Sequence, residues 1–148
     1  TAEWHRLIME ADLAKNFAAD FDRAPDQFSA VLSEMIARGR KVRAVDYNLA
    51  IDRIDLFAQA LDALFEDFDV LLTPATAGEA PEGLESTGSP AFCTLWTFCG
   101  MPAITLPLMQ GPAGLPLGVQ LVARRGADGK LLRTARWLMD KVTAEADG

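Results

Sequence analysis

The chain has 148 residues, of which 50% are hydrophobic and 24% charged, and its net charge is −7 at pH 7. This length is enough for one domain with a sizeable core, and the composition is typical of a soluble globular protein. No apolar run approaches the roughly 20 residues that span a bilayer, and a negative chain disfavours binding to nucleic-acid phosphates. We therefore expect neither a membrane nor a nucleic acid as a partner.

Residues 1–67 are predicted to be helical. Apolar side chains recur about every 3.6 residues over 4–21, which is the period of one helix face. Two further helices are predicted over 26–39 and 46–65, each beginning at an aspartate that is able to cap the first turn. Gly39 is expected to end the second of these helices.

Residues 68–143 are predicted to form three short strands and a final helix. Each strand is a short apolar run bounded by turn formers, and Gly and Pro residues mark a tight reversal between the last two. A strand is predicted over 69–74, a surface loop over 75–90, a helical turn over 91–98, two strands over 103–108 and 117–122, and a helix over 128–142.

This order of elements indicates an α/β fold, with helices first, then short strands and a final helix. The last two strands have the apolar pattern of strands that are buried on both faces. Three such strands need cover on both faces and along both edges. We therefore expect the chain to be a fragment of a longer protein, or to work beside another polypeptide.

No complete active site is evident in the sequence. His5 is the one histidine, and we expect a solvent-facing or hydrogen-bonded side chain there rather than a member of a Ser-His-Asp triad. One histidine and two cysteines without ligand spacing do not make a zinc site, so no metal site is expected. Glu79, Glu82 and Glu85 fall in the Gly/Pro-rich loop and are predicted to be solvated charges.

Cys93 and Cys99 lie in an apolar stretch of the chain. A disulfide between them is one alternative. Buried free thiols, as in a cytosolic protein, are the interpretation we prefer. We therefore expect a cytoplasmic protein.

Three segments resemble the C-terminal part of the amidase signature family: "FDVLLTPAT" (68–76), "GMPAITLP" (100–107) and "GLPLGVQLVARRGADGKLLRTARWL" (114–138). They follow the family's order and spacing, and the helical sequence "DYNLAIDRIDLFAQALDALFEDFD" precedes the first of them. Each motif is weak alone, but the combination is specific.

The resemblance implies that residues 1–148 are the C-terminal segment of a layered α/β/α amidase domain with a mixed central sheet. Family members hydrolyse carboxamides with a Ser-Ser-Lys triad set in a Gly/Ser-rich loop upstream of this region. The chain lacks that loop, so we assign no catalytic residue and expect the catalytic N-terminal part of the same enzyme to be a partner, with a homo-oligomer left open. The resemblance implies a small amide substrate and no metal or organic cofactor.

The resemblance also implies candidate walls for the pocket that binds the acyl part of the substrate. Ala91, Thr94 and Leu95 precede the "GMPAITLP" motif, and Met35 lies in the second helix. The alternative is that these residues belong to the ordinary core.

The residues in and around the motifs resemble those of stand-alone amidases more than those of the amidase-type subunit of aminoacyl-tRNA amidotransferases. That branch usually carries Asn-Leu-Ala-Gly where this chain has the sequence of residues 97–100, an aspartate near Pro90, and an arginine near Glu34 or Met35. Those charges bind the amino-acid end of glutamine, and their absence would leave that end unpaired. The amidotransferase remains an alternative, as does a non-catalytic module that assembles through its uncovered sheet edge.

Overall fold

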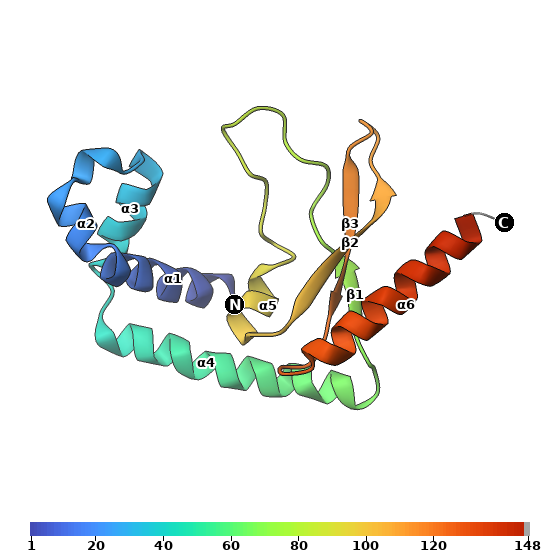
Figure 1. The fold of residues 1–148 in the computed structure, drawn as a ribbon. Coiled ribbons are helices and arrows are strands. Elements are labelled where there is room, and N and C mark those ends of the chain that lie inside the picture. The colour runs from blue at the N-terminus through green and yellow to red at the C-terminus, as the bar shows by residue number, and fades with distance from the viewer. Residues whose placement is uncertain (147–148) are drawn as a thin grey trace. The chain divides into compact units, whose positions relative to one another are not determined.

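The computed structural model describes residues 1–146, with side chains through Ala144. The chain divides into two compact units, residues 1–56 and residues 57–148 (Figure 1). We call them the helical unit and the sheet unit. Helix α4 (Ala44–Asp62) begins in the first unit and ends in the second. Along the described part of the chain, no helix combines the length and apolarity needed to cross a membrane.

The helical unit consists of α1 (Ala2–Asn16), α2 (Ala18–Arg23), a 3₁₀ turn η1 (Pro25–Gln27), α3 (Ala30–Gly39) and the first part of α4. α1 packs against α3 at a very close approach. A Cβ atom at Gly39 would overlap the backbone carbonyl of Glu10, so only glycine fits at this crossing. Ile36 is fully buried in the same helix.

Two helix boundaries before α4 differ from the prediction. The single helix expected over 4–21 is broken at Phe17, whose ring packs edge-on against Phe28 at a centroid distance of 5.9 Å. Asp26 does not cap the next helix, because it lies inside η1. Ser29 takes that role instead, and its Oγ accepts a hydrogen bond from the amide of Leu32 (3.3 Å).

Asp46 was expected to cap the third helix, but α4 begins at Ala44, two residues earlier. The Asp46 carboxylate instead pairs with the guanidinium of Arg43 at 2.7 Å, and this bond lowers the pKa of Asp46 below its ordinary range. Near Asp62 the helix tightens into a 3₁₀ turn, η2 (Ala63–Glu66), which completes the predicted helical stretch.

The sheet unit contains the three predicted strands, β1 (Leu71–Pro74), β2 (Ala103–Gln110) and β3 (Pro116–Val122). β3 lies in the middle, and it pairs antiparallel with β1 on one side and β2 on the other. The register shifts between Leu106 and Met109, at Pro107 and Leu108. Pro107 has no N–H to donate to β3, which explains a bulge at this place.

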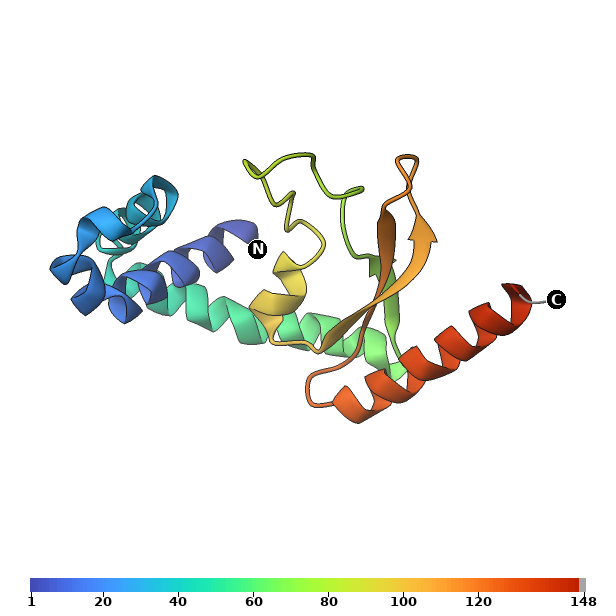
Figure 2. The ribbon, with the colours of Figure 1, turned by 45° about the horizontal axis from the view of Figure 1, so that its top comes forward.

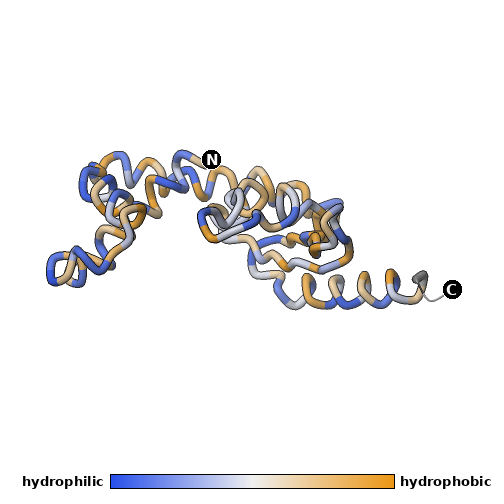
Figure 3. The backbone as a smooth tube through the Cα atoms, turned by 90° about the horizontal axis from the view of Figure 1, so that it is seen from above, coloured by the Kyte–Doolittle hydropathy of each residue, from blue (hydrophilic) through white to orange (hydrophobic). Residues whose placement is uncertain are grey.

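Helix α6 (Asp128–Ala146) covers one face of this sheet (Figure 2). Its apolar residues recur at helical spacing, and Figure 3 shows hydrophobic and hydrophilic residues alternating along it. The buried cluster between helix and sheet comprises Leu106, Leu121, Ala123, Leu131 and Ala135. This cluster is the part of the core that lies between α6 and the sheet.

The opposite face of the sheet carries α5 (Thr94–Cys99) and the loop over 75–90, as Figure 2 shows. The prediction that both hairpin strands are buried on both faces is only partly correct. β3 is buried from Gln120 to Val122, but β2 alternates, and Ala103, Thr105 and Pro107 are exposed on this second face. The small residues of this face leave room for a cavity.

Candidate functional site

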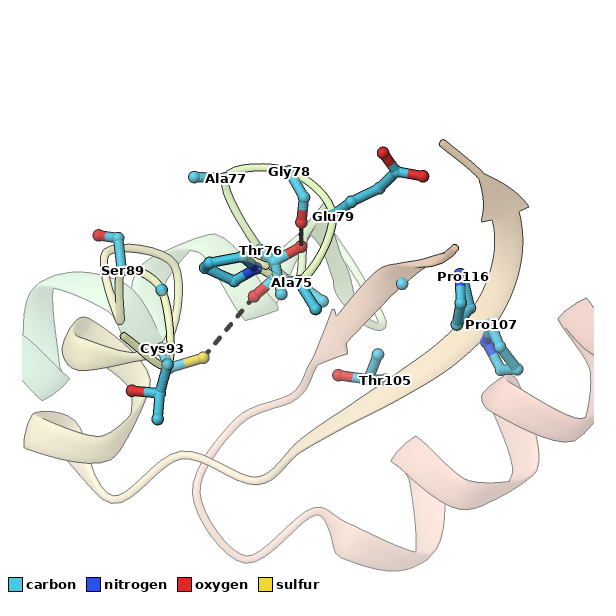
Figure 4. Close-up of a pocket in the computed structure, with 15 residues that line it drawn as sticks. Ala75, Thr76, Ala77, Gly78, Glu79, Ser89, Cys93, Thr105, Pro107 and Pro116 are labelled. Carbon is cyan, nitrogen blue, oxygen red and sulfur yellow. Dashed lines mark hydrogen bonds between the residues drawn. The ribbon is translucent and has the colours of Figure 1, made fainter. Parts of the chain in front are cut away.

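A cavity of about 780 Å³ lies in the sheet unit between the 75–90 loop and the second face of β2 and β3. Cavities of this size hold small organic ligands. The sheet contributes Thr105, Pro107 and Gly118, and the loop contributes Thr76, Ser89 and their neighbours (Figure 4). Most of these side chains are small, so the backbone and a few hydroxyl groups form the surface.

Glycine at position 118 lets the loop start close to the sheet. The amide of Ala75 donates to the carbonyl of Gly118 at 3.0 Å. A Cβ atom at Gly118 would overlap the Thr105 side chain and would lie 3.1 Å from the Cβ of Ala75. The base of the loop is therefore fixed to β3 by contacts that a larger residue would disrupt.

Cys93 closes the cavity near the start of α5. Its thiol donates a long hydrogen bond of 3.8 Å to the Ala75 carbonyl, which Figure 4 shows as a dashed line. Both cysteines are free thiols, as predicted, but Cys93 is exposed and the expectation of burial is wrong for it. Cys99 is fully buried, and burial raises the pKa of its thiol, while the positive charge of Arg125 acts weakly in the opposite direction.

Glu79 is not the solvated charge that the sequence suggested. Its carboxylate accepts hydrogen bonds from the backbone amides of Ala113 (3.0 and 3.1 Å) and Leu115 (2.9 Å) in the turn between β2 and β3. These partners lie 34 and 36 residues away along the chain. The one sequence signal was the Gly-Pro-Ala-Gly turn over 111–114, since turns of this kind present successive amides to an anion.

Gln120 is the second residue that sequence reasoning missed. It is 4% exposed in the middle of β3, and its Nε2 donates to Thr73 Oγ1 (3.1 Å) and to the Phe92 carbonyl (2.9 Å). One side chain therefore joins β3, β1 and the segment that leads into α5. A lone amide within an apolar strand is the signal that could have indicated this bridge.

Three of the four predicted pocket residues lie together at the beginning of α5. Ala91 is exposed, and Leu95 is partly buried. Thr94 is also partly buried, and its hydroxyl donates to the Pro90 carbonyl at 2.9 Å. None of the three lines the cavity described above, which ends at Ser89 and Cys93. Their role in an acyl pocket remains a prediction.

Met35, the fourth predicted residue, is partly buried on α3 in the helical unit. It is therefore not part of the sheet unit that carries the other three. Its role also remains a prediction.

Two arrangements that hydrolases use are not found among the described residues. Between Thr1 and Ala146, no lysine amino group forms a hydrogen bond with a serine hydroxyl, and no group of three or more His, Cys, Asp or Glu side chains gathers to hold a metal ion. Lys130 pairs instead with Asp69 at 2.6 Å, which lowers the pKa of that carboxyl. His5 lies on α1, partly buried.

The sequence model of one protein family, described as "Amidase", matches residues 6–132. The chain belongs to the amidase family. This match covers both units and all three strands, and it confirms the resemblance that the motifs over 68–138 suggested.

Relatives in the amidase family include both branches considered above. The chain is 31% identical over 101 residues to a subunit of the mitochondrial glutamyl-tRNA(Gln) amidotransferase of Aedes aegypti, an alignment that covers 62% of this chain and 20% of that protein. It is 32% identical over 118 residues to the putative amidase AmiD of Mycobacterium tuberculosis, with 73% of this chain and 25% of that protein covered.

A solved crystal structure of an amidase superposes with a TM-score of 0.80 at 26% identity, over 94% of this chain and 35% of that one. The α/β fold class is thereby confirmed, and within residues 1–146 the strands pair antiparallel. The chain spans between 20% and 35% of the length of these three relatives.

Proposed function

We propose that residues 1–148 form the C-terminal segment of a stand-alone amidase that hydrolyses a carboxamide to a carboxylate and ammonia. The nucleophilic serine and its base would lie in another part of the polypeptide. In such a reaction an activated hydroxyl attacks the amide carbonyl, ammonia leaves, and water releases the acid from the acyl-enzyme. The main support is the family match over residues 6–132.

The cavity of the sheet unit supports an uncharged amide as the substrate. Among the described residues that line it, Glu79 is the one charged side chain, and its carboxylate is bound to the backbone of the β2–β3 turn. Glutamine carries an ammonium and a carboxylate, and burying these groups without partners costs several kcal/mol each, roughly. A neutral acyl or aryl group therefore fits this surface better than glutamine does.

The described side chains would contribute binding surface rather than chemistry. Thr76, Ser89 and Thr105 offer hydroxyl groups, and alanine and proline residues offer apolar contact. Ala91, Thr94, Leu95 and Met35 would add to the acyl pocket once the remainder of the enzyme is in place.

The exposed apolar residues and the free thiols bear on the partner of this segment and on its location in the cell. Leu132 and Trp137 on α6 are each 58% exposed, which supports contact with the N-terminal part of the enzyme or with a second copy. Free thiols at Cys93 and Cys99 support a cytoplasmic location.

The test is to express the complete natural polypeptide and to measure ammonia release from a panel of aliphatic amides, aromatic amides and glutamine. Hydrolysis of neutral amides with little activity on glutamine is the expected result. Preference for glutamine would overturn the stand-alone assignment in favour of an amidotransferase. Absence of hydrolysis from every amide would favour a non-catalytic module.

A further inference from the structure

The 75–90 loop is attached to the sheet at two places. At its base, Ala75 bonds to the Gly118 carbonyl. Four residues further on, Glu79 accepts three hydrogen bonds from the β2–β3 turn. Between and beyond these two places the loop is exposed, since every residue from 80 to 91 has high solvent exposure.

We propose that Glu79 is a positioning residue, which holds the loop against the β2–β3 turn and so fixes the wall of the cavity. Thr76, Gly78 and Pro81 line the cavity on either side of Glu79. Without the hydrogen bonds between the Glu79 carboxylate and the turn, the distance between these residues and Thr105 and Pro107 on the opposite wall is no longer fixed. Glu79 thereby sets the size of substrate that the site accepts, a role that rests on the proposed amidase function.

The turn is shaped to receive this carboxylate. A Cβ atom at Gly111 would overlap the Glu79 side chain, so glycine is needed there for the carboxylate to reach the amides. The turn is also closed on itself by bonds from Gly111 to Leu115 (2.9 Å) and from Gly114 to Gly111 (3.0 Å). The donors for Glu79 are thus held in place by bonds within the turn itself.

The loop offers matched controls for both halves of this contact. Glu82 is an exposed carboxylate three residues beyond Glu79. Gly78 is a glycine of the same loop, but a Cβ atom there would meet nothing within 4 Å. Glu79→Ala is therefore compared with Glu82→Ala. Gly111→Ala is compared with Gly78→Ala in the exchange measurement alone, because Gly78 itself lines the cavity.

The first measurement is amide hydrogen exchange of residues 111–115 in the complete polypeptide. We expect about tenfold faster exchange of the Ala113 and Leu115 amides in Glu79→Ala and Gly111→Ala, because hydrogen bonds to a carboxylate protect their donors. Glu79→Gln, which keeps the size of the side chain, should show an intermediate increase. Exchange at the wild-type rate in Glu79→Ala would overturn the proposal.

The second measurement separates positioning from stability. For amides with bulky acyl groups, Glu79→Ala is expected to raise KM about tenfold, to leave kcat within about twofold, and to leave KM for the smallest amide unchanged. A merely structural role would lower the melting temperature and the active fraction without this dependence on substrate size, and that result would overturn the role in specificity. If the wild-type protein hydrolyses no amide, the proposed function and the size role fail together, while the exchange rates still decide whether Glu79 holds the loop.

Discussion

The contact between α1 and α3 in the helical unit and the contact between α6 and the sheet in the sheet unit bury different kinds of side chain. In the helical unit the contact between α1 and α3 includes Glu10, which is 5% exposed and accepts bonds of 2.9 and 2.7 Å from the guanidinium of Arg38. In the sheet unit the fully buried residues between α6 and the sheet are leucines and alanines, and other apolar side chains such as Ile104 and Met139 pack against them. The first contact thus combines a charged pair with small apolar residues such as Ala14, whereas the second is apolar.

This difference shows what a sequence pattern can convey. Apolar patterning predicts the contact between α6 and the sheet, because Leu106 and Leu121 fall in apolar strand runs and Leu131 and Ala135 share one helix face. Two side-chain hydrogen bonds of the helical unit join residues that are far apart in sequence. Glu10 and Arg38 are 28 positions apart, and Asp12 and Tyr47 are 35 positions apart. No local period indicates such pairs. The predictions below test whether the two units differ in stability as they differ in contacts.

The largest effect is expected from Leu121→Ala in the apolar core. Leu121 is 1% exposed at the centre of the sheet, and a buried leucine truncated to alanine costs about 3–5 kcal/mol of unfolding free energy. Urea unfolding, monitored by hydrogen exchange of separate segments, would measure the loss of unfolding free energy in the sheet unit. Leu72→Ala is the control, because Leu72 pairs with Leu121 in the sheet but is 64% exposed. Equal losses for both variants would show that the core does not lie where α6 packs.

The second effect is the loss of the Glu10–Arg38 pair in the helical unit. Hydrogen bonds to charged groups contribute about 1.5–3 kcal/mol in general, and Arg38 is half exposed, so water can replace part of what it loses. Glu10→Ala is therefore expected to destabilise the helical unit roughly half as much as Leu121→Ala destabilises the sheet unit. The same exchange experiment measures it.

Glu34→Ala is the matched control for this pair. The Glu34 carboxylate is 76% exposed and lies 3.9 Å from the same guanidinium, and exposed pairs of this kind contribute little. If the two variants had the same small effect, the helical unit would not depend on its buried charge.

The third effect comes from the one buried polar side chain that joins elements in the sheet unit, among the residues that the structure describes. Gln120→Leu leaves the Phe92 carbonyl without its donor, which is expected to cost about 1–3 kcal/mol. Thr73→Val removes only the other partner and is expected to cost less. Faster hydrogen exchange of residues 92–94 would report the release of this segment. A more stable Gln120→Leu variant would mean that the sheet unit is held by apolar packing alone.

The elements that depend on apolar patterning were predicted from the sequence more accurately than those that depend on long-range contacts. The strands over 69–74, 103–108 and 117–122 and the final helix were predicted close to their observed bounds, because each is a periodic or continuous apolar run with clear ends. The break at Phe17 could not be predicted, since an aromatic contact with Phe28 decides it.

The candidate site was predicted less well than the fold. Glu79 and Gln120 act through bonds to distant backbone groups, and their neighbours in sequence carry no trace of those partners. The residues that the family motifs suggested at the start of α5 lie outside the cavity, and their role stays a prediction. The cavity wall depends on how a loop and a turn meet in space, and that meeting is visible only in the structure.

The smallest expected effect is a shift in the pKa of Tyr47. The titration of Tyr47 reports directly on one hydrogen bond of the helical unit. Its hydroxyl donates to Asp12 Oδ1 at 3.0 Å, and this bond raises the pKa of Tyr47 above the ordinary tyrosine value of about 10. A raised pKa in the folded state means that the contribution to stability is present below about pH 10 and is lost as the pH rises through the folded value. Tyr47 is the only tyrosine, so tyrosinate absorbance follows this one group.

Asp12→Ala is expected to move the titration midpoint of Tyr47 down toward the ordinary value, whereas Asp52→Asn, a change at an exposed carboxylate on α4, should leave it in place. Identical midpoints in the wild-type protein and Asp12→Ala would mean that the phenol is not held by the carboxylate. The Glu10–Arg38 pair would then be the one long-range polar contact of α1 that these variants support. The contrast between the two units would rest on that pair alone.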